Sequence, residues 1–446
     1  MSREVSNSNS QVVDSLDDLL IVFSKGSRNQ KEYKIGMEFE RFLVDAQTLH
    51  AVPFEGNRGI EKFLQELASS DLPGHSWEKI LDQGKLISLK WGETAITLEP
   101  GGQVEISCNA HNDMQNLYRE LESLDSMMHK IARKIGRKLM TRGIQPMETV
   151  ESSPWMPKSR YRSMRQYYEK RNQSAFEMML LTASIQVNFD YSSEQDAVRK
   201  VLVSSFLSPI LGAVFANSSL EQGKPNGFVT RRIPIWRKTD PDRCGTPDFF
   251  VDGTFSFEKY RDYALDIPMY FAFRNGEYVN VQNVTFREFL SSQGGKWGPV
   301  TLGDWELHLT TLFPEVRLKN HLEFRTADSN PIELVVALAT MWKGLFYNEA
   351  AIAKWFEFFR KYNKNDLTIS LTDVSKNGLS AKFGSHSVLS LAQDLINDAV
   401  QYLSSQPSMK SEIQFLHPIQ QILDEGVSPG EKLIEMFKKN QDHQNL

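Results

Sequence analysis

The chain has 446 residues, of which 40% are hydrophobic and 24% are charged, so it can bury a large core. Its formal net charge of −5 gives no electrostatic footprint for nucleic acid or for an anionic membrane surface. A small anionic substrate would therefore need positive charge that is concentrated locally. We expect no nucleic-acid partner and no membrane partner, and the oligomeric state is left open.

Cysteine content and the N-terminal sequence bear on the cellular compartment. The chain has two cysteines, Cys108 and Cys244, and residues 1–30 contain no apolar stretch typical of a secretory signal. No apolar run approaches the roughly 20 residues of a membrane span. These features predict a protein of the reducing cytoplasm.

The N-terminal residues are expected to form an extension of the main domain. The first dozen residues are rich in serine and asparagine, which predicts disorder. Residues 12–23 have apolar side chains at helical spacing and predict a short helix that ends near Gly26. We therefore assign residues 1–30 to an extension that carries a short helix.

Residues 33–52 have the pattern of a strand that carries two glutamates. Successive side chains of a strand point to opposite faces, so Glu38 and Glu40 share one face and their apolar neighbours share the other. For these two residues alone, a solvated strand face explains the pattern equally well.

Residues 98–107 form a second segment with carboxylates. The Pro-Gly-Gly sequence at 100–102 predicts a turn or bulge that re-aims Glu99. Polar and apolar residues then alternate, which places Glu105 on the polar face. Cys108 follows on the apolar face and is expected to be a core thiol.

Later segments predict three long helices and a helical C-terminal part. One helix is expected over residues 113–139, one after Ser192 or Ser193 as the capping residue, and one over residues 331–361. Residues 228–316 predict strands and long loops. The chain beyond Tyr347 is predicted to be mostly helical, with a last helix starting at Ser428 and Pro429. No repeat and no long linker interrupts the chain, so we expect one α+β domain with an antiparallel sheet.

Two further strand segments have a polar face. In residues 184–191, Gln186 belongs to the polar set, and in residues 321–325 Glu323 and Arg325 share a face. A simple ion pair between Glu323 and Arg325 is one explanation of the last segment. If the polar faces converge, the carboxylates raise each other's pKa unless cations lie between them. Hard divalent ions are the natural cations for such a site.

The sequence lacks two common nucleotide-binding motifs and a zinc site. Neither a P-loop nor a strand-linked Rossmann glycine motif is present. Any ATP would therefore be held in another way, through metal ions that bridge carboxylates and phosphates. No cysteine and histidine cluster has zinc spacing. His308 and His321 are expected to be strand or surface residues.

Basic residues form two further groups. Arg231 and Arg232 precede Ile-Pro-Ile-Trp, and Arg243 follows. One of these arginines can bind the α-carboxylate of an amino acid bidentately, and a charged surface loop is the alternative. The basic residues 157–165 suit phosphate contact, although a solvated loop is the preferred interpretation.

Six motifs occur in the order in which one enzyme family has them. Together they resemble the glutamate–cysteine ligases of the plant and alphaproteobacterial type. The motifs are Ile35-Gly36-Met37-Glu38-Phe39-Glu40, Leu98-Glu99-Pro100-Gly101-Gly102-Gln103-Val104-Glu105, Met156-Pro157-Lys158-Ser159-Arg160-Tyr161, Gln186-Val187-Asn188-Phe189-Asp190, Ile235-Trp236 with Thr239-Asp240 and Arg243, and residues 313–328 around Leu322-Glu323-Phe324-Arg325.

The resemblance implies a fold and a reaction. The fold is a glutamine-synthetase-like antiparallel sheet, flanked by helices, whose concave face binds Mg-ATP and glutamate. The resemblance also implies Mn²⁺ as a substitute for Mg²⁺. ATP phosphorylates the γ-carboxylate of L-glutamate, and the amine of L-cysteine attacks the acyl phosphate to give γ-glutamylcysteine, the first step of glutathione biosynthesis. Residues 31–446 would form one catalytic domain, with a helical part at about 331–446.

The resemblance also implies roles for individual residues. Arg232 and Gln186 would bind substrate, and Arg325 would contact ATP and the transferred phosphoryl group. The metal ligands would be Glu38, Glu40, Glu99, Glu105 and Glu323.

Some family features do not carry over. The family often has Gly-Ala-Asp-Gly-Gly-Pro where this chain has Thr326-Ala327-Asp328-Ser329-Asn330-Pro331. Redox control is not expected of Cys108 and Cys244. Three alternative functions stay open: a ligase that uses another amine, a non-catalytic relative that binds a nucleotide or a partner protein, and a metal-dependent phosphohydrolase.

Overall fold

A nine-stranded antiparallel sheet forms the centre of the protein. The computed structural model describes residues 9–70 and 76–444. The strands of the sheet are β1 (Ile35–Asp45), β2 (Glu78–Asp82), β3 (Lys85–Trp91), β4 (Thr94–Leu98), β5 (Gln103–Ser107), β6 (Arg137–Met140), β7 (Ile185–Phe189), β14 (Val316–Leu318) and β15 (Leu322–Phe324). Their order is β14-β15-β7-β1-β5-β4-β3-β2, and β6 pairs with the C-terminal end of β1. The antiparallel sheet of an α+β fold is thus confirmed.

Helices cover both faces of this sheet. They are α1 (Ile21–Ser24), α2 (Ile60–Ala68), α3 (Met114–Lys134), α4 (Ser159–Arg171), α5 (Ala175–Leu181), α6 (Glu194–Val214), α7 (Arg232–Thr239), α8 (Phe257–Leu265), α9 (Phe286–Ser291), α10 (Leu302–Leu309), α11 (Ile332–Phe346), α12 (Glu349–Phe359), α13 (Lys364–Asn377), α14 (Val388–Ser405), α15 (His417–Glu425) and α16 (Pro429–Gln444).

Short 3₁₀ helices and two-stranded ribbons complete the secondary structure. The 3₁₀ helices are η1 (Leu16–Leu20), η2 (Gln30–Glu32), η3 (Asp248–Phe250), η4 (Gly295–Trp297), η5 (Gly378–Ser380) and η6 (Lys410–Leu416). The ribbons pair β8 (Leu220–Glu221) with β9 (Lys224–Pro225), β10 (Cys244–Gly245) with β13 (Phe313–Pro314), β11 (Phe271–Arg274) with β12 (Glu277–Asn280), and β16 (Lys382–Phe383) with β17 (His386–Ser387).

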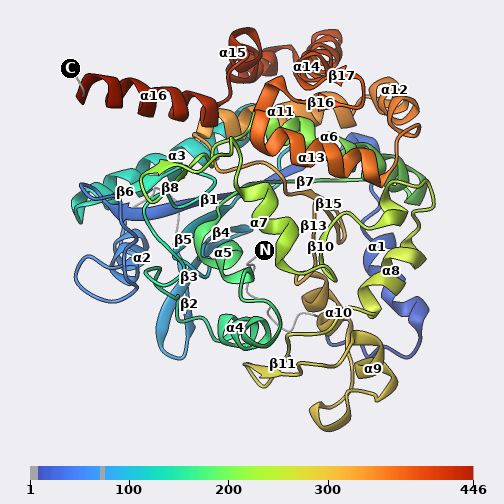
Figure 1. Cartoon of the computed structure of the whole chain (residues 1–446). Helices are drawn as coiled ribbons and strands as arrows, with labels where there is room; N and C mark the ends of the chain where they lie inside the picture. Colours follow the sequence, from blue (N-terminus) through green and yellow to red (C-terminus); the bar gives the residue numbers. More distant parts are fainter. Residues whose placement is uncertain (1–8, 71–75, 445–446) are drawn as a thin grey trace.

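The two faces of the sheet have different partners. Helices α11 and α14 lie on one side, whereas α5 and α7 lie on the other (Figure 1). On the first side Phe189 stacks on Trp342 of α11 at a centroid distance of 5.2 Å, and Phe324 packs on the same indole. Burial of such aromatic side chains is a major source of stability. The opposite, polar face of these strands is therefore directed toward α5 and α7.

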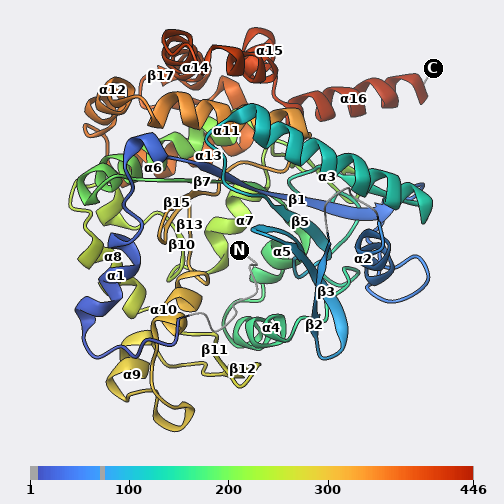
Figure 2. The same cartoon turned by 180° about the vertical axis from the view of Figure 1, so that it is seen from behind.

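Segments that are distant in sequence also pack together away from the sheet. Figure 2 shows α1 beside α8 and α10. Phe23 of α1 contacts Phe257 of α8 and Trp305 of α10. The predicted short helix at residues 12–23 is confirmed in outline as η1 followed by α1. The disorder predicted for the first dozen residues falls mostly on residues 1–8, which lie outside the described residues.

Helix boundaries follow local capping signals, some of which the sequence-based predictions missed. Ser193 caps α6 as predicted, and its side chain accepts a hydrogen bond from the Asp196 amide at 3.2 Å. The helix predicted over 113–139 ends at Lys134, because Gly136 adopts a φ of +69° and the chain continues as β6. The helix predicted over 331–361 is two helices, since Asn348 caps a new one.

Residues 228–316 differ most from their prediction. They were expected to form strands and long loops; the short strands β10, β11, β12 and β13 are present, but the region also contains α7, α8, α9 and α10. The last helix begins at Pro429 as predicted, and Cys108 is buried as predicted.

Helix α6 is long and apolar enough, by length and composition, to cross a membrane. However, 89% of its most apolar part is buried, as in the core helix of a soluble protein.

His308 is a core residue, contrary to the prediction of a strand or surface position. It lies in α10 with 2% of its surface exposed, and its Nε2 is 2.8 Å from the carbonyl oxygen of Ala264. Burial lowers the pKa of His308 from 6.5 to about 3, so the folded protein keeps this imidazole neutral.

Buried His308 is expected to make the protein sensitive to acid. The unfolded chain protonates this residue near pH 6.5, whereas the folded protein does so only near pH 3. Above pH 6.5 neither state is protonated at His308, so the residue causes no loss of stability. As the pH falls from 6.5 toward 3, only the unfolded chain takes up the proton, and the free energy of unfolding decreases by up to about 1.4 kcal/mol per pH unit. Urea unfolding of His308→Gln between pH 7 and 4 should show a smaller pH slope than the wild type. The exposed His417→Gln is the control; equal slopes for His308→Gln and the wild type would contradict the assignment.

Candidate active site

Three buried carboxylates meet on the polar face of the sheet. Glu40 of β1 lies directly opposite Glu105 of β5 in the antiparallel register, so both side chains point to the same face. Glu99 follows β4, the other neighbour of β5. We call Glu40, Glu99 and Glu105 the carboxylate trio, and all three are buried.

A tight turn brings Glu99 to this position. The amide of Gly102 donates to the carbonyl oxygen of Glu99 at 2.9 Å, which closes the β4–β5 hairpin. A side chain at Gly101 would lie 2.2 Å from the carbonyl oxygen of Leu180, so only glycine fits there. The predicted turn at 100–102 is thus confirmed.

Crowding changes the protonation of the trio. Burial, together with the charges of Glu105 and Glu99, raises the pKa of Glu40 to about 8. Burial and the charge of Glu105 raise the pKa of Glu99 to about 7. The Oε1 atom of Glu99 is buried without a hydrogen-bond partner in the described part of the chain. Glu40 and Glu99 therefore resist carrying negative charge beside Glu105 unless a cation is bound, and the acceptor capacity of Glu99 is unused.

Hydrogen bonds from β7 orient Glu40. Its Oε2 accepts from the amide of Ser184 at 2.6 Å, and its Oε1 accepts from Nε2 of Gln186 at 3.0 Å. The Oε1 atom of Gln186 in turn accepts a hydrogen bond from Nη1 of Arg325. Gln186 thus links the carboxylate trio to the arginine at the end of β15.

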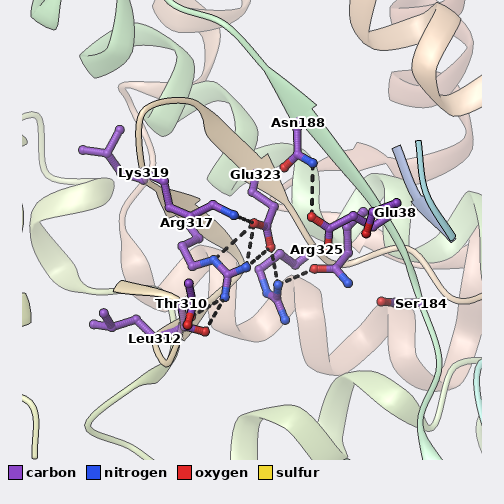
Figure 3. Close-up of polar contacts among 12 residues, drawn as sticks. Glu38, Ser184, Asn188, Thr310, Leu312, Arg317, Lys319, Glu323 and Arg325 are labelled. Atoms are coloured by element: carbon purple, nitrogen blue, oxygen red, sulfur yellow. Dashed lines mark hydrogen bonds and ion pairs between the residues drawn. The ribbon is translucent and has the colours of Figure 1, made fainter. Parts of the chain in front are cut away.

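Glu323 lies in a separate, positively charged cluster (Figure 3). Its oxygens are 2.6 Å from Nη2 of Arg317 and 2.8 Å from Nζ of Lys319, and Nη1 of Arg325 also donates to it. Burial by itself would raise the pKa of Glu323, but these cations hold it well below the usual value. The ion pair considered for Glu323 and Arg325 is present, as one of three.

Arg317 and Lys319 have no role in the sequence-based prediction. A usable signal was present, because Arg317 stands between Val316 and Leu318 in the same alternation that identified the other strands. Arg317 is fully buried, and its Nη1 also donates to the carbonyl oxygens of Thr310 and Leu312. It fixes both the carboxylate of Glu323 and the chain that leads into β14.

Glu38 lies between the two clusters. It is paired with Ser107 of β5 and with Gln186 of β7, and its Oε1 accepts from Nδ2 of Asn188 at 3.2 Å (Figure 3). The predicted convergence of the polar strand faces is therefore present. It brings together Glu38, Glu40, Glu99, Glu105, Gln186, Glu323 and Arg325.

Arg232 reaches the same region from α7 rather than from the surface loop that was considered. Its Nη1 and Nη2 donate to the carbonyl oxygens of Thr326 and Arg325 at 3.1 and 2.9 Å. Its Nε is buried without a partner among the described residues. Burial lowers the pKa of Arg232 to about 10, so it stays charged at neutral pH. Arg232 and Arg325 line a small cavity of about 30 Å³ together with Trp236.

The neighbouring arginines have other partners. Arg231 forms ion pairs with Glu177 and Glu221 at distances of 3.5 and 3.8 Å. Arg243 is fully buried, and its Nε donates to Asp240 at 2.8 Å. Of the three arginines in this region, Arg232 is the one that contacts the backbone of Arg325.

The basic segment 157–165 is not the solvated loop that was preferred. From Ser159 it forms α4, and Lys158 and Arg160 are both 2% exposed. Nζ of Lys158 donates to Oγ1 of Thr97 at 2.5 Å, and Thr97 is the register partner of Glu105. Positive charge therefore lies directly beside the carboxylate trio, where Lys158 and Arg160 lower the pKa of Glu99 against its burial.

Comparison with known proteins identifies the family. The model of glutamate–cysteine ligase family 2 matches residues 34–446. The chain belongs to this family. It is 37% identical over 426 residues to a chloroplastic glutamate–cysteine ligase of Brassica juncea, an alignment that covers 94% of this chain and 80% of that enzyme. The chloroplastic ligase of Arabidopsis thaliana is 36% identical, with 94% and 79% covered. The protein is therefore a ligase, and the resemblance in its motifs is confirmed.

A solved structure shows the same fold. A glutamate–cysteine ligase of Francisella tularensis, solved in complex with AMP, superimposes with a TM-score of 0.54 at 14% identity and covers 91% of this ligase and 84% of that chain. At this identity the similarity concerns the fold, which is glutamine-synthetase-like as predicted.

The predicted cytoplasmic location is wrong by the same comparison. The Brassica, Arabidopsis and tomato relatives are all named as chloroplastic enzymes rather than cytoplasmic ones. The prediction rested on cysteine content and on the lack of a secretory signal, and neither feature distinguishes one reducing compartment from another.

Proposed function

We propose that the polar face of the sheet carries out the ATP-dependent ligation of L-glutamate to L-cysteine. ATP phosphorylates the γ-carboxylate of glutamate, and the amine of cysteine then displaces phosphate to give γ-glutamylcysteine. Phosphoryl transfer needs charge neutralisation and positioning rather than a protein nucleophile. The observation that supports this proposal most directly is the carboxylate trio, which Gln186 connects to the guanidinium of Arg325.

The donor set of the trio fits a divalent metal ion. Among the described residues, no three acidic, histidine or cysteine side chains already form a ready ligand set. The chemistry of the trio nevertheless suits Mg²⁺, because its members are oxygen donors whose mutual repulsion a cation would relieve, and Oε1 of Glu99 lacks a partner in the described structure. We assign Glu40, Glu99 and Glu105 to this ion, with Glu38 beside them. Bound Mg²⁺ would neutralise the phosphates of ATP.

Glu323 fits a metal less well than the trio does. Its two oxygens already face Arg317, Lys319 and Arg325, so the predicted metal role requires that the pair with Arg317 opens. We propose that Glu323 mainly positions Arg325. The guanidinium of Arg325 then meets the negative charge that builds on the transferred phosphoryl group. Nε of Arg232 supplies a donor for the carboxylate of glutamate.

The proposed reaction is tested by its dependence on each substrate. ATP turnover should need glutamate and Mg²⁺, should be strongly stimulated by cysteine, and should give one ADP for each γ-glutamylcysteine. Coupled ADP release and mass spectrometry of the product measure both quantities. Phosphate release at the same rate without any amine would instead identify a phosphohydrolase. A screen of other amines by mass spectrometry separates cysteine from alternative acceptors.

Arg232→Lys is expected to raise the KM for glutamate by roughly 10- to 100-fold. An ammonium cannot hold the carbonyl oxygens of Thr326 and Arg325 and also offer the donor that Nε provides, and the loss of a hydrogen bond to a charged group amounts to about 1.5–3 kcal/mol. Steady-state kinetics with glutamate and with ATP as the varied substrate check this, with Arg231→Lys as a neighbouring control. An unchanged KM for glutamate with impaired use of ATP would move Arg232 to the phosphate end of the site.

A further inference from the structure

A second cavity lies outside the candidate active site. It has a volume of about 560 Å³, within the range of small-molecule sites, and the helices α11 and α14 contribute to its wall together with η2 and η6. Helix α11 packs on the apolar face of the sheet through Trp342, whereas the carboxylate trio lies on the polar face. The cavity is therefore on the opposite side of the sheet from the site already described.

The acidic side chains of this cavity already have partners. Glu412 is 2.7 Å from Nζ of Lys343, and Glu349 is 3.0 Å from Nη2 of Arg199. Asp113 accepts hydrogen bonds from the first amides of α3 and caps that helix. Two of these three carboxylates are thus paired with cations, and the positive end of α3 stabilises the third.

Several of the groups that remain can donate hydrogen bonds. The hydroxyl of Tyr347 is buried and has no hydrogen-bond partner in the described part of the chain. For the ammonium of Lys31, the hydroxyl of Tyr402 and the hydroxyl of Ser408, no described residue serves as a hydrogen-bond or ion-pair acceptor, and all three residues line the same cavity. Burial raises the pKa of both tyrosines, so their hydroxyls stay protonated and able to donate.

We propose that this cavity binds a small organic monocarboxylate. The exposed ammonium of Lys31, which has no ion-pair partner among the described residues, matches one negative charge, and the tyrosine hydroxyls can donate to the oxygens of a carboxylate. A ligand with several phosphates would leave most of its charge without a partner. The rings of Tyr33 and Tyr347, with centroids 5.3 Å apart, and the side chain of Met409 offer an apolar wall for the body of the ligand.

Phenylacetate is a suitable probe, with 2-phenylethanol and phenethylamine as neutral and cationic analogues of similar shape. Isothermal titration of the full chain should show saturable binding of one phenylacetate, with the two analogues at least roughly tenfold weaker. Tyr347→Phe should weaken phenylacetate binding by roughly tenfold, the scale for the loss of a hydrogen bond to a charged group. The removed hydroxyl has no partner in the described structure, so thermal unfolding should be unchanged.

Two further variants complete the test. Lys31→Gln should weaken binding and reduce its dependence on salt, because it removes the charge that attracts the carboxylate. Tyr362→Phe and Lys361→Gln, which lie outside the cavity wall, should bind phenylacetate as the native protein does. The proposal is overturned if the native protein shows no saturable phenylacetate binding, if phenethylamine binds equally well, or if Tyr347→Phe binds with native affinity. If Tyr347→Phe does not fold, Tyr402→Phe takes its place with the same expectation.

Discussion

Arg325→Ala is expected to lower kcat by roughly 10²–10³-fold, or about 2.7–4 kcal/mol, the scale for the loss of one preorganised donor. The guanidinium is held by Gln186 and Glu323 and is 4% exposed, so its position is set before substrate binds. Negative charge on the phosphoryl oxygens grows toward the transition state, and a fixed guanidinium stabilises that state more than the bound substrates. The KM values for glutamate and cysteine should change little.

The competing interpretation gives Arg325 a purely structural role. In that case Arg325→Ala would weaken the cluster around Glu323, and the variant would unfold at a lower temperature with normal kcat at saturating Mg²⁺. Measuring kcat, Mg²⁺ dependence and thermal unfolding on one preparation separates the two roles. Arg231→Ala, which removes an arginine that pairs at the edge of the same region, is the matched control. A normal kcat in Arg325→Ala would rule out the catalytic role.

Strand alternation predicted most of this site because it is a local property. Two residues that are two positions apart on a strand share a face whatever the strand pairs with, so Glu38 and Glu40, or Glu323 and Arg325, are placed by sequence alone. That the strands lie side by side depended on the resemblance to a family, because pairing across 144 residues, as between Glu40 and Ser184, leaves no local signal.

Strand alternation could not predict which side chains contact each other in the folded protein. Arg317 binds Glu323 because β14 and β15 place these two residues opposite each other, and a slip of one residue would separate them. Lys158 and Arg160 suggested a solvated loop because their basic neighbours dominate the segment, whereas tertiary packing buries both. His308 is similar, since only the fold brings it to the carbonyl of Ala264.

Glu105→Gln and Glu323→Gln are expected to differ in stability while both lose activity. Glu105 belongs to a group of like charges and contributes to the raised pKa of Glu40 and Glu99, so its neutralisation relieves repulsion. Activity should fall by roughly 10²-fold or more and the Mg²⁺ requirement should rise, because the proposed metal site loses one of its ligands. Thermal stability without Mg²⁺ should be unchanged or higher.

Glu323→Gln makes the same chemical change among positive charges, so we expect it to lower stability. It leaves Arg317, Lys319 and Arg325 around a neutral amide, and removing one partner of a buried ion pair destabilises a protein by roughly 3–5 kcal/mol. Urea unfolding without Mg²⁺ measures the stability of both variants, and steady-state kinetics over a range of Mg²⁺ concentrations measures their activity. Glu169→Gln, an exposed glutamate of α4, is the control for loss of one charge. If Glu323→Gln were as stable as the wild type and differed only in its Mg²⁺ requirement, Glu323 would be a metal ligand and the positioning role proposed for it would be wrong.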